Sequence, residues 1–143
     1  MTGATPKVRR VLAVDPGDRR TGLAGTDPTG TIAVPLDTLV AADPEAMLTQ
    51  LAAVVRERAP ELILVGVARH ADGSAGERAR KSEALMARLR ALFPALRVEG
   101  IDEAHSTDEA HARLKGAGLR AAARKKRADA IAALVMIERY LGW

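Results

Sequence analysis

The sequence has no cysteine, only three histidines, and one residue each of Phe, Tyr and Trp among its 143 residues. The absence of cysteine excludes disulfides, iron–sulfur clusters, thiolate zinc sites and cysteine nucleophiles. The scarcity of aromatic residues argues against the base-stacking platforms of many single-strand binders. It also predicts an aliphatic core.

Long apolar runs are absent as well. No segment approaches the roughly 18–20 apolar residues that a membrane-spanning helix needs, and residues 1–6 do not resemble a signal peptide. We therefore expect a cytoplasmic protein with no membrane partner. The length fits one domain, residues 1–143, and 48% hydrophobic with 28% charged residues is an ordinary globular composition.

Basic residues outnumber acidic ones and give a formal net charge of +4, which favours a polyanionic partner without establishing one. No acidic residue occurs between Glu109 and Asp129. A run of charge is commonly a solvated face, but this one leads directly into the last expected helix. We interpret it as a nucleic-acid contact made through the phosphate backbone. Its basic residues are Arg113, Lys115, Arg120, Arg124, Lys125, Lys126 and Arg127.

The pattern of apolar residues and turns predicts an α/β fold. Three strands joined by short turns come first, and parallel strands alternating with helices follow. This order predicts a mixed five-stranded sheet with helices on both faces. The expected strands are 8–14, 21–26, 31–36, 61–66 and 96–101.

The expected helices begin at residues typical of helix starts. Asp43 caps a helix over Pro44–Arg58, with Pro44 at its first position. A capping box at Ser74 opens a helix to about Phe93, with Leu85, Leu89 and Leu92 on its inner side. The remaining expectations are a short helix from Ser106 to about Leu114, a loop from Gly116 to Arg127, and a helix from about Ala128 to Leu141.

Four carboxylates stand at the ends of these elements. Asp15 follows the first strand, Asp102 and Glu103 follow the fifth, and Asp129 lies in the first turn of the last helix. Each has a structural explanation by itself, as a turn residue, an exposed strand exit or a partner of the helix dipole. Together they lie where the crevice of such a sheet is expected. Clustered carboxylates suit Mg²⁺ or Mn²⁺.

Four motifs in this order resemble the YqgF (RuvX) family, whose members are named as Holliday junction resolvases or pre-16S rRNA nucleases. The resemblance covers nearly the whole chain, from Val8 to Trp143. The motifs are Asp15-Pro16-Gly17 with Arg20 and Gly22; Leu64-Val65-Gly66-Val67 with Asp72-Gly73 and Gly76; Asp102-Glu103 with Ser106-Thr107; and Lys125-Lys126 with Asp129.

The resemblance implies an RNase H-like fold and a metal-dependent nuclease. It implies that Asp15, Glu103 and Asp129 are the catalytic metal ligands for Mg²⁺ or Mn²⁺, with Asp102 as a further candidate ligand. Two such ions activate a water and stabilise the leaving oxygen in phosphodiester cleavage.

The chain departs from the family pattern at two places. The family has Arg directly after Asp-Glu, where this chain has Ala104, and Gly-Leu-Pro where it has Gly66-Val67-Ala68. The first departure removes one phosphate contact or salt bridge, for which Arg69, His70 and His105 are candidate substitutes. Two further basic residues, Arg19 and Arg20, lie beside Asp15 and suit phosphate positioning.

Three functions remain open on the sequence. We favour a nuclease that processes the 5′ end of precursor 16S ribosomal RNA, as a monomer or homodimer. The alternatives are a Holliday junction resolvase acting on branched DNA and a non-catalytic RNA-binding protein on the same fold. A nucleotide-binding protein of the actin and sugar-kinase type is disfavoured, because it needs two such domains.

Overall fold

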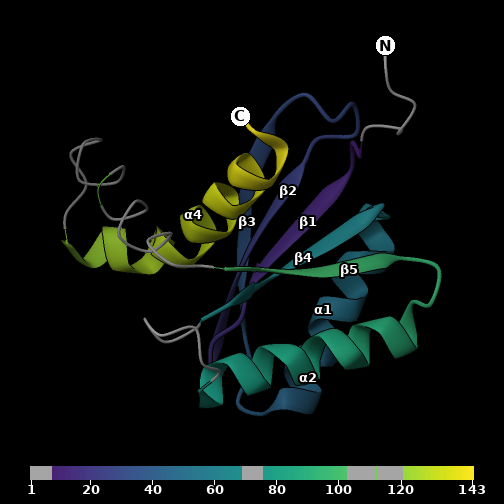
Figure 1. The fold of residues 1–143 in the computed structure, drawn as a ribbon. Helices are drawn as coiled ribbons and strands as arrows, with labels where there is room; N and C mark the ends of the chain where they lie inside the picture. The colour runs from purple at the N-terminus through teal and green to yellow at the C-terminus, as the bar shows by residue number, and fades with distance from the viewer. Residues whose placement is uncertain (1–7, 69–75, 103–111, 113–120) are drawn as a thin grey trace.

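The computed structural model describes residues 8–68, 76–102, 112 and 121–143, with the side chains of the last helix described from Ala128 onward. Figure 1 shows the chain as a ribbon. In chain order the described elements are β1 (Val11–Asp15), β2 (Arg20–Thr26), β3 (Ala33–Val40), α1 (Pro44–Arg58), β4 (Leu62–Val67), α2 (Glu77–Leu92), β5 (Arg97–Asp102) and α4 (Ala121–Leu141).

The strands form one mixed sheet in the order β3-β2-β1-β4-β5. The first three strands are antiparallel neighbours, whereas β4 runs parallel to β1 and β5 runs parallel to β4. Short turns join the antiparallel strands, and the parallel strands are reached through helical crossovers. The predicted mixed five-stranded sheet is confirmed.

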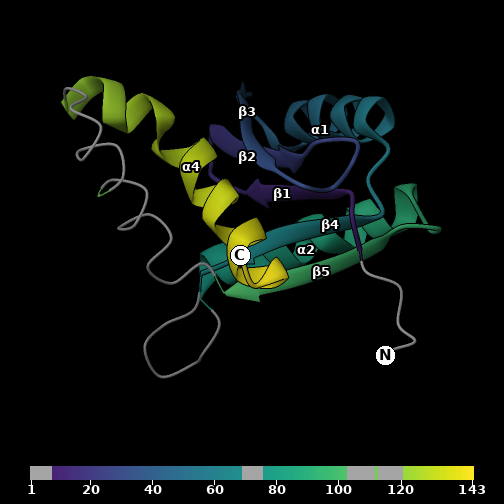
Figure 2. The same cartoon turned by 90° about the horizontal axis from the view of Figure 1, so that it is seen from above.

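Each face of the sheet is covered by different helices (Figures 1 and 2). On β1, Leu12 and Val14 pack into the cluster that contains residues of α1 and α2. Val11 and Ala13 pack into the other cluster, together with residues of α4. This alternation along β1 assigns one face of the sheet to α1 and α2 and the opposite face to α4.

Helix α1 has the predicted bounds and the predicted cap. The backbone N–H of Ala46 donates to Asp43 Oδ1 at 2.8 Å, and Pro44 begins the helix, where its missing N–H costs nothing. At the other end Ala59 adopts a left-handed conformation with φ of 47° and donates to the Val55 carbonyl. Both ends of α1 are therefore satisfied by nearby groups.

Two predictions about α2 are wrong. Its N-cap is Gly76 rather than Ser74, because the first helical hydrogen bond runs from the Arg80 N–H to the Gly76 carbonyl. Leu92 is 46% exposed, so it is not on the inner face. Phe93, at the end of the helix, instead packs against the core.

Helix α4 begins at Ala121, whereas the sequence predicted a loop as far as Arg127. Alanine, arginine and lysine are strong helix formers, and residues 121–127 contain no others. The short helix expected from Ser106 to about Leu114 lies outside the described residues except for Ala112. Within the described parts of the chain, no helix, α4 included, combines the length and hydropathy needed to cross a membrane.

Replacing Asp43 by alanine removes the acceptor that caps α1. We expect Asp43→Ala to lower the free energy of unfolding by about 1 kcal/mol, measured by urea denaturation followed by circular dichroism. Asp43→Ser keeps an acceptor at the same place and should retain most of the stability. Equal losses in both variants would contradict the capping role.

Candidate active site

Asp15 ends β1 at the carboxyl edge of the parallel strands. Val11 and Ala13 face α4, so the two-residue alternation of the strand gives Asp15 the same face. The residue is partly buried. Its partner in the register on β2 is Gly22. The candidate catalytic carboxylate thus lies under α4, beside a position without a side chain.

Gly22 brings α4 close to Asp15. A Cβ atom at Gly22 would lie 2.7 Å from the Cβ of Asp129, and closer still to the Asp129 carbonyl group. Only glycine leaves room for this approach. Asp15 and Asp129 therefore adjoin the same glycine, although they stand near opposite ends of the sequence.

Arg20 holds the Asp129 carboxylate. Its Nη2 and Nε atoms donate to Asp129 Oδ2 at 2.9 and 3.2 Å. Arg20 lies two residues before Gly22 on β2, so both belong to the same face of the sheet. Among the described residues, no hydrogen bond reaches Asp129 Oδ1. The arginine that the sequence assigned to phosphate positioning thus has a carboxylate partner, 109 residues away along the chain.

Asp102 lies on the α2 side of β5, not on the side that α4 covers. It shares this side with Gly100, where an added Cβ atom would lie 3.3 Å from Met86 Cε on α2. Asp102 is exposed. Glu103, the preferred second acid, lies outside the described residues. Within the part of the chain that the structure describes, no group of three or more His, Cys, Asp or Glu residues is placed to hold a metal ion.

The described acidic residues nevertheless fit a divalent cation. Asp15 and Asp129 supply carboxylate oxygens, the donors that Mg²⁺ and Mn²⁺ prefer. Two nearby carboxylates repel each other unless positive charge compensates them. Arg20 provides one such charge on Asp129 Oδ2. The pair can serve as part of a cation site.

Apart from Arg20, which binds Asp129, the predicted nucleic-acid contacts divide into three groups. Arg19 is exposed in the turn after Asp15, and its carbonyl accepts from the Ala41 N–H at 3.0 Å. Residues 124–127 belong to the first turns of α4, which project beyond the strands in both views (Figures 1 and 2). The others lie outside the described residues: Arg69, Arg113, Lys115 and Arg120.

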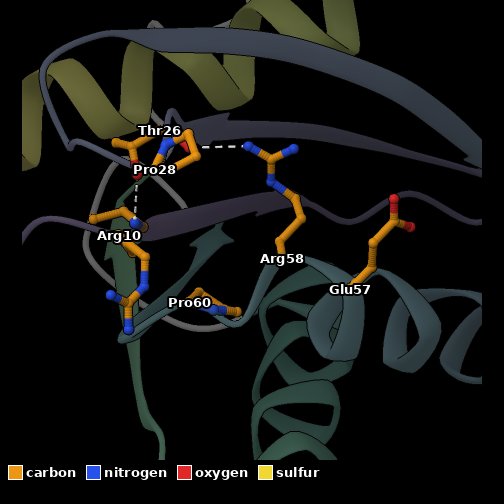
Figure 3. Close-up of a pocket in the computed structure, with 7 residues that line it drawn as sticks. Arg10, Thr26, Pro28, Glu57, Arg58 and Pro60 are labelled. Atoms are coloured by element: carbon orange, nitrogen blue, oxygen red, sulfur yellow. Dashed lines mark hydrogen bonds between the residues drawn. The ribbon is translucent and has the colours of Figure 1, made fainter.

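A cavity of about 220 Å³ lies at the opposite end of β1, beside Val11 (Figure 3). Its two arginines are bonded to the protein itself. Arg58 donates to the Thr26 carbonyl at 2.9 Å, and Arg10 Nε donates to the Ala59 carbonyl at 2.9 Å. The Val11 N–H donates to Thr26 Oγ1 at 2.8 Å. These hydrogen bonds connect residues near the start of β1, the end of β2 and the end of α1. They lie at the end of β1 opposite to Asp15.

Comparison with known proteins decides the family. Residues 9–142 match the model of the RuvX family, described as Holliday junction resolvase. The chain belongs to the RuvX family. Membership places it among hydrolases of phosphodiester bonds, as the sequence predicted.

Two curated relatives of this RuvX chain are similar over more than nine-tenths of their length. A protein of Chlorobium phaeobacteroides named "Putative pre-16S rRNA nuclease" is 35% identical over 136 residues, covering 94% of this chain and 92% of the relative. A protein of Rubrobacter xylanophilus with the same name is 35% identical over 137 residues, covering 96% and 95%.

Two solved structures show the same fold. RuvC of T. thermophilus in complex with a Holliday junction substrate has a TM-score of 0.54 at 24% identity, covering 92% of this chain and 94% of that one. The Fowlpox virus resolvase in complex with Holliday junction DNA has a TM-score of 0.53 at 13% identity, covering 92% and 98%. The predicted RNase H-like fold is confirmed.

A methyl group at Gly22 cannot fit beneath α4. We expect Gly22→Ala to lower the free energy of unfolding by about 1–3 kcal/mol through overpacking, measured by urea denaturation. We also expect Mn²⁺ to raise the melting temperature of the wild type, and Gly22→Ala to reduce that rise, because Asp129 is pushed away from Asp15.

Gly100→Ala is the matched control, since it adds the same methyl group to the opposite face of the sheet. Its nearest neighbours are the side chains of Val67 and Met86, at 3.1 and 3.3 Å. We expect a smaller loss of stability and an unchanged response to Mn²⁺. An equal loss of the Mn²⁺ response in both variants would contradict the role given to Gly22.

Proposed function

We propose that this RuvX-family chain is a divalent-metal-dependent nuclease that processes the 5′ end of precursor 16S ribosomal RNA. The observation that carries the proposal is the approach of Asp129 to Asp15 across Gly22. The names of the curated relatives support the choice of substrate. Residues 1–143 are proposed to form one nuclease domain, which acts in the cytoplasm, where this substrate would be met.

The proposed ligands of Mg²⁺ or Mn²⁺ are Asp15, Glu103 and Asp129. The ions, when bound, supply Lewis-acid chemistry that activates a water and stabilises the leaving oxygen. Asp102 remains a candidate ligand, but its place on the α2 side of β5 favours Glu103 for the second acid. Asp15 is held by the backbone ladders that β1 forms with β2 and β4.

Arg20 has a positioning role in this proposal. By donating twice to Asp129 Oδ2, it fixes the carboxylate in one orientation and leaves Oδ1 for a cation. It also lowers the repulsion between Asp129 and Asp15 in the absence of the ion. A fixed carboxylate needs less reorganisation when the ion and substrate bind.

Binding of the substrate is proposed to use phosphate contacts. The candidate contacts are the predicted basic residues, among them Arg19, Arg69 and residues 124–127. Such contacts hold and orient the nucleic-acid backbone but do not recognise the base sequence. The paucity of aromatic residues agrees with binding of this kind. Affinity should therefore fall steeply with salt.

Branched DNA is the second candidate substrate, because the description of the matching family model is Holliday junction resolvase. Symmetrical cleavage of a junction requires two active sites related by a two-fold axis, hence a dimer. A monomer would favour the ribosomal RNA substrate. A protein that binds RNA yet never cleaves it would instead be a non-catalytic member of the family.

Asp15→Asn tests the assignment of the central ligand. We expect the loss of one carboxylate charge to reduce cleavage by about 100-fold or more, or about 2.7 kcal/mol of transition-state stabilisation. The measurement compares precursor 16S RNA, unstructured RNA and a four-way DNA junction, each with Mg²⁺, Mn²⁺ or EDTA. Asp102→Asn and Glu103→Gln in the same panel decide which of these two acids is needed.

The variants are first compared by circular dichroism in EDTA, so that a folding defect is not mistaken for a catalytic one. Wild-type protein that cleaves equally well in EDTA, or Asp15→Asn protein that cleaves at the wild-type rate, would overturn the metal site. Preferential cleavage of the junction by a dimer would replace the RNA substrate with branched DNA.

Arg20→Gln separates a positioning role from a phosphate contact. We expect kcat to fall by about 10- to 100-fold, because Asp129 loses its anchor. KM for RNA and the salt dependence of binding should hardly change, whereas the Mn²⁺ concentration for half-maximal activity should rise. Arg20→Lys, which keeps the charge, should restore part of kcat. A higher KM with unchanged kcat would mean that Arg20 binds phosphate instead.

A further inference from the structure

A small cavity lies on the α2 side of the sheet, next to the turn that follows Asp15. It has a volume of about 60 Å³ and is lined by six residues. This is more than the about 10–15 Å³ that one water needs, so a group of several atoms fits. Three lining residues come from the turn and three from the first turns of α2: Pro16, Gly17, Asp18, Arg78, Lys81 and Ser82.

Ser82 gives this cavity a polar interior. It is only 4% exposed, yet no described residue forms a hydrogen bond with its hydroxyl. A buried hydroxyl without a partner is unfavourable, and most such groups in proteins bond to water or a ligand. An oxygen or another hydrogen-bonding atom placed in the cavity would satisfy this hydroxyl.

Lys81 is a lining residue of the cavity, and two carboxylates lie beside its ammonium group. Its Nζ lies 2.8 Å from Asp18 Oδ1 and 3.7 Å from Glu77 Oε1. The hydrogen bond from Lys81 lowers the pKa of Asp18, and the positive charge of Arg78 lowers it further. The hydrogen bond to Asp18 in turn raises the pKa of Lys81. Both partners are therefore charged at neutral pH. The Asp18 carboxylate occupies the position that another anion would take.

The Lys81–Asp18 ion pair is exposed, and its partners can exchange at little cost. The side chains of Lys81 and Asp18 are 56% and 80% exposed. Pairs of this kind contribute little to stability and are screened by salt. A phosphate oxygen can therefore displace Asp18 from Lys81 without disturbing the fold.

We propose that Lys81, Arg78 and Ser82, with the Pro16–Asp18 turn, form a subsite for one phosphate of the substrate backbone, and that Asp18 competes with this phosphate for Lys81. The subsite begins one residue after Asp15, so a strand bound here crosses the carboxyl edge of β1. It fixes which neighbouring phosphodiester reaches the candidate active site. This inference rests on the proposed nucleic-acid substrate.

Substitutions of Lys81 and Asp18 should change the affinity for RNA in opposite directions. We expect Lys81→Gln to weaken binding of labelled RNA about fivefold to tenfold near 0.1 M salt and to reduce the salt slope by about 1. Asp18→Asn should tighten binding, because the competing carboxylate charge is gone. Ser82→Ala should weaken binding with no change in the salt slope. Fluorescence anisotropy in EDTA measures all three without cleavage.

Arg88 and Glu45 provide the matched controls. They form an exposed ion pair between α2 and the first turn of α1, with Arg88 Nη1 2.7 Å from Glu45 Oε1. Arg88→Gln and Glu45→Gln change the net charge as Lys81→Gln and Asp18→Asn do. We expect both controls to bind RNA nearly as the wild type does.

The subsite is refuted if Lys81→Gln behaves like Arg88→Gln, or if both members of the Lys81–Asp18 pair shift binding in the same direction. Cleavage in Mn²⁺ separates this outcome from failure of the proposed function. If Lys81→Gln and Asp18→Asn shift RNA binding in opposite directions but the protein never cleaves RNA, the subsite is supported and the nuclease proposal is wrong. Normal cleavage with no shift would retain the nuclease and reject the subsite.

Discussion

The close approach of α4 to Gly22 is the contact on which the candidate active site depends. The helix can pass over β2 there because Gly22 has no side chain, and this passage places Asp129 beside the strand that carries Asp15. A larger residue would force the helix away from the sheet. The acids would then be separated although the sheet itself remained intact.

The two faces of the sheet serve different purposes. The face under α1 and α2 is filled mainly by leucine and valine, which bury a large apolar area. The contact between the other face and α4 includes Ala13 and Ala24 of the sheet and Ala133 of the helix, and small side chains at a contact allow a helix to lie close to a sheet. The face under α1 and α2 contributes much of the stability. The face under α4 lets the helix lie close enough to bring Asp129 near Asp15.

Charge is arranged around one edge of the sheet. Asp15 and Asp129 lie on the α4 side, with Arg20 compensating Asp129. Lys81 lies on the α2 side, where Asp18 balances it. Each ion pair is partly or largely exposed, so neither is a major source of stability. The Arg20–Asp129 pair, donated through two nitrogens, orients a carboxylate, whereas the more exposed Lys81–Asp18 pair can exchange partners.

The sequence by itself determined the succession of strands and helices up to β5 and the start and end of α1, because alternation, capping residues and turns act over a few neighbouring positions. It singled out Asp15 and Asp129 as candidates through their places at element ends and the family resemblance. It mistook the start of α2 and made residues 121–127 a loop, because Ser74 and the nearby glycines outweighed helix propensity. Only the tertiary structure decided that Arg20 binds Asp129, that Asp102 faces α2 and that Lys81 meets Asp18. Those pairings depend on how distant elements pack, which no local pattern in the chain records.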